Sequence, residues 1–398
     1  EGFAMGGARM FAENDAANLA FNPAAMTKIE GEKAKVTLAY ISPHGKWDAW
    51  SDDAKTKHIG SGHNRVHPAV VPGLYYVKQI NDKEWLGMGT FTRFGNMCQF
   101  ERDSIVGTNA FSSRLNGTSL TMNYARKHDS KWSTSVGAEI NYIGLQIDKN
   151  LAHPAGFNTT DGSVKKSPIH LEGTSWALGW NAAANYQFDD KNEFGVVYHS
   201  KVKHSVEANY DVHGAIGDLG MGNTGDAYGC ITLPESWMLG YGHKFNDKTR
   251  MELNATWTRW SRFDALNISM GGVMDTMTNG QGLQSPKNWK DGWRYAVGIE
   301  HKLSDKYTLL AGIAHDERGI PDENADFMVP TGERDTYSIG LQYNDKKQTI
   351  ALGLGYMDVG DLNMTGHTTS EMGTDGYKKA KMHDSYTKII VLSYQYNF

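Results

Sequence analysis

The chain has 398 residues, with 44 glycines, 11 % aromatic residues, two cysteines and a formal net charge of −5. No apolar run approaches the roughly 18 residues that a membrane helix requires, and no basic patch carries interleaved aromatic residues. These features exclude a helical membrane protein and a nucleic-acid partner. They leave a soluble protein or an outer-membrane barrel, in whose strands lipid-facing and lumen-facing residues alternate.

The first 32 residues do not predict a strand, because they are small, polar and turn-forming around Gly6-Gly7-Ala8, residues 14–18 and Asn22-Pro23-Ala24. We expect residues 1–32 to form a hatch inside a barrel made by residues 33–398, with the barrel satisfying the backbone polar groups of the hatch. The alternative is a disordered tail. Glu1-Gly2-Phe3 lacks the features of a signal peptide, so we expect the numbering of a processed chain.

From residue 33 onward, short polar clusters alternate with long polar segments. Asn, Asp and Ser side chains bond to nearby backbone groups, so each short cluster predicts a tight hairpin. A membrane barrel has this alternation because its periplasmic turns are short and its outer loops are long. The short clusters are 81–83, 129–131, 189–191, 246–248, 304–306 and 345–347, and the long segments include 41–69, 148–172, 264–292 and 359–384.

The runs beside these clusters show a two-residue period. Trp176, Leu178 and Trp180 fall on one face of a predicted strand, and smaller or polar residues between them fall on the other. The large apolar face is expected to contact lipid. The alternative is a half-buried sheet in a soluble protein, which would not explain the alternating connection lengths.

The predicted fold class is therefore all-β: a transmembrane antiparallel β-barrel of about fourteen strands in the bacterial outer membrane, with the hatch in its lumen. An even number of strands places both termini on the periplasmic side. The predicted strands are 33–40, 70–80, 84–94, 117–127, 132–147, 173–188, 192–210, 228–245, 249–263, 293–303, 307–316, 335–344, 348–358 and 385–398.

Aromatic residues border the predicted strands at both ends, as expected at membrane–water boundaries. The last strand carries an alternating apolar face that ends at Phe398 and resembles the assembly signal of outer-membrane proteins; the alternative is a soluble edge strand. Beside the short turns lie Trp85, Trp132, Phe188, Phe194, Phe245, Tyr307 and Tyr343, and near the long loops lie Trp176, Tyr210, Trp260, Trp293 and Tyr386.

Several motifs, in this order and spacing, make the sequence resemble the FadL family of outer-membrane long-chain fatty-acid and hydrocarbon transporters. Over nearly the whole chain, the resemblance includes the segment 4–8, followed by 14–16 and the Asn-Pro-Ala motif at 22–24. It also includes Leu-Pro at 233–234, Trp-Ser-x-Phe at 260–263, the segment 289–293, and Gly312, Asp316, Pro321, Pro330 and Arg334. The resemblance implies a monomeric barrel with a hatch, embedded among outer-membrane lipids. It implies a transporter. We expect no enzyme, because the adjacent pairs His199-Ser200 and His315-Asp316 would point to opposite faces of a strand, and we expect no cofactor or metal.

The resemblance also implies a route for a long-chain fatty acid or another hydrophobic small molecule. The ligand enters a groove between outer loops, passes to an internal pocket and leaves sideways through a gap in the third strand. The gap falls near Phe94-Gly95-Asn96, since glycine permits a bulge, although a glycine here otherwise indicates only a turn. The groove candidates are Leu151, Phe157, Ile169, Leu171, Ile216, Leu219 and Met221, for which ordinary loop packing is the alternative.

Recognition of a carboxylate is a separate question. Some family members carry an arginine in the fifth strand, where this chain has Gly144; Arg259, Arg262 and Lys203 are possible substitutes. A general porin, a surface adhesin and an outer-membrane enzyme are the competing functions. The histidines in 44–67 are expected to be solvated loop residues rather than a metal site, and the sequence leaves open whether Cys98 and Cys230 form a disulfide.

Overall fold

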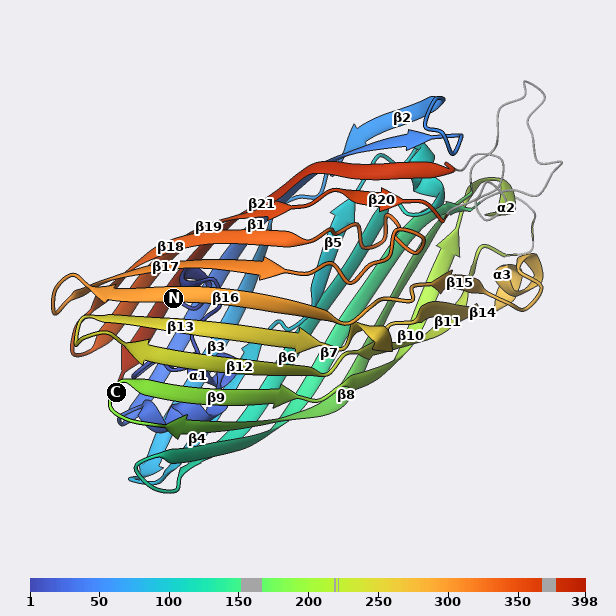
Figure 1. The fold of residues 1–398 in the computed structure, drawn as a ribbon. Coiled ribbons are helices and arrows are strands. Elements are labelled where there is room, and N and C mark those ends of the chain that lie inside the picture. Colours follow the sequence, from blue (N-terminus) through green and yellow to red (C-terminus); the bar gives the residue numbers. More distant parts are fainter. Residues whose placement is uncertain (152–166, 218–219, 221, 367–376) are drawn as a thin grey trace.

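A computed structural model describes the chain except residues 152–166, 218–219, 221 and 367–376 (Figure 1). The strands form a closed antiparallel barrel of fourteen wall strands. Closure comes from β1 (Glu32–Trp50), which pairs with β21 (Lys379–Asn397) on one side and with β3 (Ala69–Asn81) on the other. A closed wall leaves no edge strand, so its backbone groups can be satisfied within the sheet in lipid.

The other wall strands follow in sequence order, and three of them are interrupted. They are β4 (Glu84–Phe91) continued by β5 (Gly95–Gln99), β6 (Ser112–Lys127), β7 (Trp132–Leu151), β8 (Ser167–Gln187), β9 (Asn192–His199) continued by β10 (Val202–Val212), β11 (Thr224–Leu233) continued by β12 (Ser236–Lys244), β13 (Thr249–Thr258), β16 (Gly292–Lys302), β17 (Tyr307–Asp316), β18 (Arg334–Asn344) and β19 (Gln348–Val359).

Short elements complete the described part of the chain. The extra strands β2 (His58–His63), β14 (Ala265–Met270), β15 (Leu283–Pro286) and β20 (Leu362–Met364) pair with wall strands or with each other at the long-loop end. The helices are η1 (Phe3–Met5), α1 (Asn18–Phe21), η2 (Pro23–Lys28), η3 (Ile105–Thr108), α2 (Gly214–Gly217), η4 (Trp260–Arg262) and α3 (Gly272–Met277). None of these described helices has the length and apolar character needed to cross a membrane.

The six predicted hairpins all connect consecutive wall strands at one end of the barrel, and the long connections lie at the other (Figure 1). Asx side chains fix these turns as predicted. Asp129 Oδ1 accepts hydrogen bonds from the backbone of Lys131 and Trp132, both at 2.7 Å, and Asp189 and Asp345 bond in the same way.

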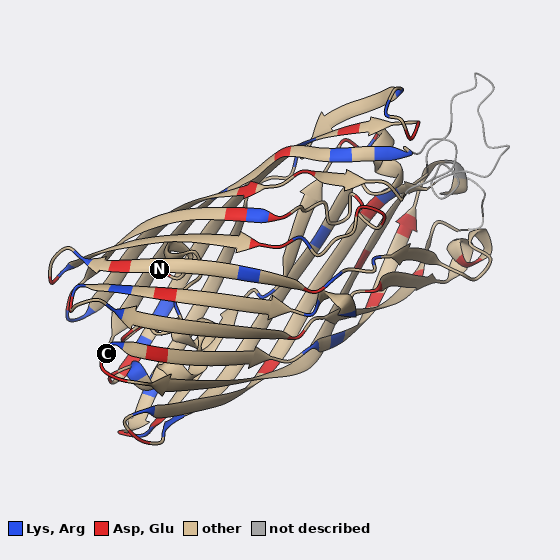
Figure 2. Cartoon of the chain, in the orientation of Figure 1, with Lys and Arg blue, Asp and Glu red and all other residues tan. Residues whose placement is uncertain are grey.

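The outer wall is apolar between two charged ends. Leu178 and Trp176 are 79 % and 69 % exposed, and Ile390, Leu392 and Phe398 of the last strand also face outward. Charged residues concentrate at the short turns and toward the long-loop end, leaving a mostly uncharged stretch of wall between them (Figure 2). A continuous apolar surface of this extent is typical of a barrel wall that faces lipid rather than water.

The structure corrects the predictions at several strand ends and at some of the aromatic residues. Among the strand ends, β6, β8, β11 and β21 begin at Ser112, Ser167, Thr224 and Lys379, four to six residues before the predicted starts. The strand β1 extends to Trp50 instead of ending at residue 40, and the ninth wall strand ends at Thr258 instead of 263. Some aromatic residues assigned to the membrane boundary face inward instead, among them Trp260, which packs against Trp289. Trp85 donates to Ile29 O at 2.8 Å, and Tyr210 donates to Gly271 O at 2.6 Å, because each indole or hydroxyl finds a partner in the interior.

Candidate functional site

An apolar cavity occupies the interior at the long-loop end of the barrel. Its volume is about 490 Å³, and its walls come from inward-facing residues of β7, β8, β14 and β15 and from the connection after β17. The apolar lining residues are Ile147, Ile169, Leu171, Leu266, Ile268, Leu283 and Met328. This lining belongs to a larger buried cluster that continues along β10 and β11. Such a space favours a hydrophobic ligand over water.

Polar groups also line this cavity. Lys149 at the end of β7 lines it together with Asn109 and Glu323. The neighbouring Lys287 is almost fully buried and forms an ion pair with Asp326. The cavity therefore combines an apolar lining with polar groups that include one lysine, which suits an apolar molecule whether or not it carries a polar end.

The structure brings together four of the seven predicted groove residues. Ile169 and Leu171 line the cavity, and Leu151 and Ile216 belong to the same buried cluster. They lie beneath the outer loops, inside the barrel mouth. The other three, Phe157, Leu219 and Met221, lie outside the described residues.

The third wall strand is broken where Phe94-Gly95-Asn96 was singled out. Phe91 pairs with Ser119 and Gly95 pairs with Asn116, so residues 92–94 face only residues 117–118. One surplus residue in a strand makes a β-bulge. Phe94 turns inward and contacts Trp260 at a ring distance of 5.5 Å, and Asn96 Nδ2 donates to Met328 O at 2.7 Å.

The glycine that the bulge requires lies on the neighbouring strand. A Cβ on Gly117 would lie 2.8 Å from Phe94 O, whereas a Cβ on Gly95 would meet no atom closer than Leu115 O at 3.7 Å, an ordinary contact. Gly117 therefore allows the close approach of the two backbones, and Gly95 is not required for steric reasons.

The bulge leaves an opening in the hydrogen-bonding of the wall. Among the described residues, β3 pairs with the third wall strand only from Leu74, opposite Thr90, toward the short-turn end. Residues 69–73 of β3 pair with β1 alone. Farther toward the loops, Arg65 N donates to Gln99 O at 2.6 Å. The stretch of the third wall strand between Thr90 and Gln99 has no backbone partner on its β3 side, and it is called the wall window below.

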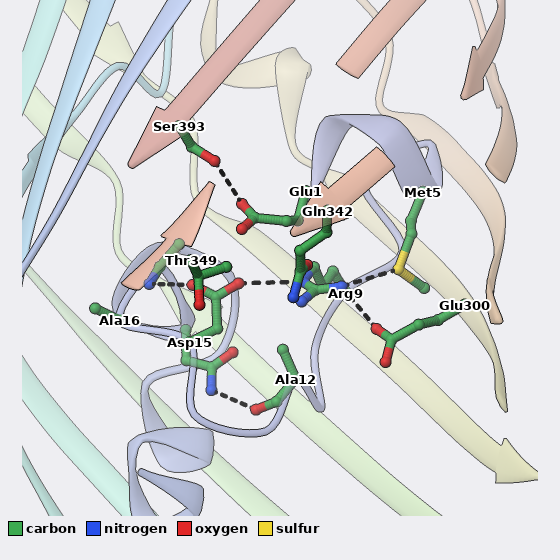
Figure 3. A network of polar contacts seen from close by, with 12 residues as sticks. Glu1, Met5, Arg9, Ala12, Asp15, Ala16, Glu300, Gln342, Thr349 and Ser393 are labelled. Carbon is green, nitrogen blue, oxygen red and sulfur yellow. Dashed lines mark hydrogen bonds and ion pairs between the residues drawn. The ribbon is translucent and has the colours of Figure 1, made fainter. Parts of the chain in front are cut away.

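The N-terminal segment, residues 1–31, lies inside the barrel at the short-turn end (Figure 1). Arg9 connects Asp15, at 3.1 Å, with Glu300 of β16, at 2.9 Å (Figure 3). Lys35 of β1 contacts Asp15 at 2.7 Å and Glu1 at 2.6 Å. Burial alone would raise the pKa of Asp15, but Lys35 and Arg9 outweigh burial and hold that pKa well below its ordinary value.

The Asn-Pro-Ala motif folds this segment and attaches it to the wall. Asn22 Oδ1 accepts a hydrogen bond from Ala24 N at 3.2 Å and caps η2, and Pro23 fits at the start of that helix. Asn22 Nδ2 donates to Met10 O at 3.0 Å and to Asn185 Oδ1 of β8 at 2.7 Å.

The wall carries glycines where the N-terminal segment lies against it. A Cβ on Gly312 would overlap the backbone of Met5, and one on Gly298 would lie 2.7 Å from Met5 O. Side chains at these inward positions would displace the segment, so glycine makes the close contact possible.

Two features of the interior were not predicted: Lys149 in the cavity, and Arg93 in the break of the third strand. Arg93 Nη1 lies 3.2 Å from Glu139 Oε2 of β7, and Glu139 also accepts a hydrogen bond from His199 Nδ1 at 2.6 Å. The sequence did offer one signal for Arg93, because it is a charged residue within a run of mostly apolar residues. Strand alternation did not reveal it, because the bulge shifts the alternation by one residue.

The other candidate residues lie away from the cavity or have other partners. Arg259 and Arg262 bind Glu235, and Lys203 is exposed on β10, so none of the three lines the cavity. Both cysteines are free, with Cys98 buried and Cys230 exposed. In the described part of the chain, no group of histidine, cysteine or acidic residues is suited to a metal ion.

Comparisons with known proteins agree with this architecture. The family model described as "Outer membrane protein transport protein (OMPP1/FadL/TodX)" matches residues 1–398. The long-chain fatty acid transport protein of Escherichia coli K12 is 26 % identical over 376 residues, covering 86 % of this chain and 82 % of that protein. Outer membrane protein P1 of Haemophilus influenzae is 27 % identical over 364 residues, covering 80 % and 75 %.

Solved structures share the fold. A Pseudomonas aeruginosa FadL homologue superimposes with a TM-score of 0.86 at 20 % identity, covering 100 % of this chain and 97 % of the other. The Pseudomonas putida toluene transporter TodX superimposes with a TM-score of 0.73 at 18 % identity and the same coverage. At these identities the superpositions support the barrel fold itself.

Proposed function

Because the chain belongs to the outer membrane protein transport protein family (OMPP1/FadL/TodX), a family of outer-membrane transporters, we propose that it carries long-chain fatty acids or similar hydrophobic molecules through the outer membrane. The single observation that carries this proposal is the apolar cavity inside the barrel, with the N-terminal segment on one side of it and a wall window beside it. Transfer of an alkyl chain from water into such a cavity gains about 0.8 kcal/mol per CH₂ group.

The proposed route begins at the outer loops and ends in the membrane. The ligand enters between the loops at 148–172 and 211–230, where Leu151, Phe157, Ile216, Leu219 and Met221 are the candidate contacts. It then occupies the cavity against Ile169 and Leu171. It leaves through the wall window beside Phe94-Gly95-Asn96 and reaches lipid without crossing water. No energy source is needed, because each step keeps apolar surface out of water.

In this proposal the N-terminal segment acts as a hatch. Its ion pairs and the Asn22-Pro23-Ala24 motif hold it across the short-turn half of the lumen, which blocks a direct path to the periplasm. The barrel works as a monomer, since the cavity, the window and the hatch all lie within one chain.

Uptake by proteoliposomes tests the proposal. Leu171→Asn places an amide in the cavity lining and is expected to lower fatty-acid uptake about tenfold, because a buried polar group without a partner costs about 1–3 kcal/mol. Glu172→Gln, one residue away on the exposed face of β8, is the matched control and should leave uptake unchanged. Equal uptake by both variants would contradict the role of the cavity, and free passage of ions would favour a porin.

A further inference from the structure

The surplus residue in the third wall strand is an arginine. Phe91, Phe94 and Asn96 all lie on the inner side of the wall, so ordinary alternation from Phe91 to Phe94 needs only one residue between them. Thr92 is exposed and occupies that outward position. Arg93 is therefore the inserted residue, and its side chain enters the interior, where only 8 % of it is exposed.

Arg93 reaches across the lumen to three other wall strands. Its Nη1 contacts Glu139 Oε2 at 3.2 Å and Ser200 O at 3.5 Å, and its Nη2 contacts Pro234 O at 3.4 Å. Ser200 follows the end of β9 and Pro234 follows the end of β11, so both carbonyls belong to breaks in the wall. The guanidinium of Arg93 therefore connects the break in the third strand with the breaks after β9 and after β11. Arg93 with Glu139, Ser200 and Pro234 is called the Arg93 bridge below.

Two other side chains position the Glu139 carboxylate for this contact. It is fully buried, and it also accepts hydrogen bonds from His199 Nδ1 at 2.6 Å and from Asn181 Nδ2 at 2.9 Å. With these two other partners, Glu139 would keep hydrogen bonds if the guanidinium moved away. The guanidinium would keep only the neutral carbonyls of Ser200 and Pro234, and a buried cation without a counter-charge is costly.

The Arg93 bridge lies between the cavity cluster and the N-terminal segment. On β7, Ile143 of the apolar cluster is four residues from Glu139 toward the loops. Toward the short turns, Asn181 bonds to Asn123, and Ser133 of β7 donates to Ala24 O of the N-terminal segment at 3.4 Å. The Arg93 bridge thus lies at the short-turn end of the wall window, which begins beyond Thr90 at the level of Ile140 of β7.

We propose that the Arg93 bridge is a latch on the wall window, and that a ligand with a terminal carboxylate opens it by replacing Glu139 as the partner of the guanidinium. This inference rests on the proposed function, and it adds a residue that distinguishes acids from uncharged hydrophobic molecules. A planar guanidinium binds a carboxylate through paired hydrogen bonds, so the ligand carboxylate can take the place of Glu139 on Arg93. The displaced Glu139 carboxylate then depends on its hydrogen bonds from His199 and Asn181. An uncharged chain end offers no exchange and leaves the bridge closed.

Proteoliposome uptake of palmitate and of methyl palmitate separates these ligands. The wild-type protein is expected to take up the acid faster than the ester. Arg93→Gln removes the bridge, so ester uptake should rise about tenfold, the change expected for loss of a charge-assisted contact, and the preference for the acid should disappear. The matched control is Arg114→Gln, which removes an exposed arginine of β6 and should behave as wild type.

A second variant tests the exchange itself. Glu139→Gln leaves an amide on His199 and Asn181 but removes the counter-charge of Arg93, so palmitate should bind more tightly while methyl palmitate binds as before. Heat-dependent migration in detergent gels shows that each variant is a folded barrel. If the wild-type protein transports palmitate and Arg93→Gln keeps its preference for the acid, the latch is contradicted although the proposed function stands. Uptake of neither ligand by the wild-type protein would contradict the proposed function.

Discussion

At the scale of single residues, the charged groups inside the barrel occur in contacts that span distant parts of the chain. Arg9 joins Asp15 to Glu300, and Lys35 joins Asp15 to Glu1. Buried charges are tolerated only when they are paired, and removal of one partner leaves the other uncompensated. Asp15 is therefore central, because it is shared between one cation of the N-terminal segment and one of the wall.

Asp15→Asn is expected to loosen the N-terminal segment. It removes a buried carboxylate from two cations, so we expect a loss of about 3–5 kcal/mol and a measurable ion conductance in planar bilayers. The control is Glu13→Gln in the same segment, where the pair with Lys244 is exposed and contributes about 0–1 kcal/mol at most. A silent Asp15→Asn channel would contradict the assignment.

The same contact predicts a pH dependence. The pKa of Asp15 in the folded protein is depressed, so its stabilising contribution is complete above the ordinary value of 3.8 and is lost only as the solution becomes more acid. Wild-type conductance should therefore stay low and constant between about pH 5 and pH 8. A rise in conductance within this range would point to another titrating group.

At the scale of elements, the breaks in the seventh and eighth wall strands were the part of the fold that the sequence did not predict. The segment 192–210 has apolar residues on both sides of its break, so the pattern looks continuous although β9 ends at His199 and β10 begins at Val202. The extension of β1 was missed for a different reason. Its inward residues Trp47 and Ala49 are buried, and its outward Lys46 and Asp48 are charged, which resembles a polar loop.

The hairpins and the lipid-facing residues were predictable because each depends on a local rule. Asx residues fix the turns, and lipid selects apolar side chains at alternate positions. The cavity lining was predictable only in part, through Ile169 and Leu171. Its polar group at Lys149 and the Arg93 bridge depend on contacts between strands far apart in the sequence, which no local pattern encodes.

Deletion of Arg93 is expected to close the wall window. Without the surplus residue, Phe91 and Phe94 alternate around Thr92, so β4 and β5 can form one continuous strand that pairs with β3. Fatty-acid uptake should then fall to the level of protein-free liposomes, whereas Arg93→Gln keeps the bulge and retains uptake. Uptake by the deletion variant at the wild-type rate would show that the bulge is not needed for release.

At the scale of the whole molecule, the polarity of the wall inverts along the barrel axis. Toward the short turns, large apolar residues face outward and the lumen holds polar residues and the N-terminal segment. Toward the loops, residues such as Lys203 and Glu207 face outward, and Val202 and Val206 face the interior. In the proposed function, the wall window joins the apolar interior of one half to the apolar exterior of the other.

The proposed function requires a path for a hydrophobic molecule along apolar surface from the outer loops to the membrane. A structure of the wild-type protein determined with bound palmitate tests it most directly. We expect elongated density in the cavity against Ile169, Leu171 and Met328, with the N-terminal segment still in the lumen. Ordered water running through an open lumen from the loops to the short turns, with palmitate absent from the cavity, would contradict the account.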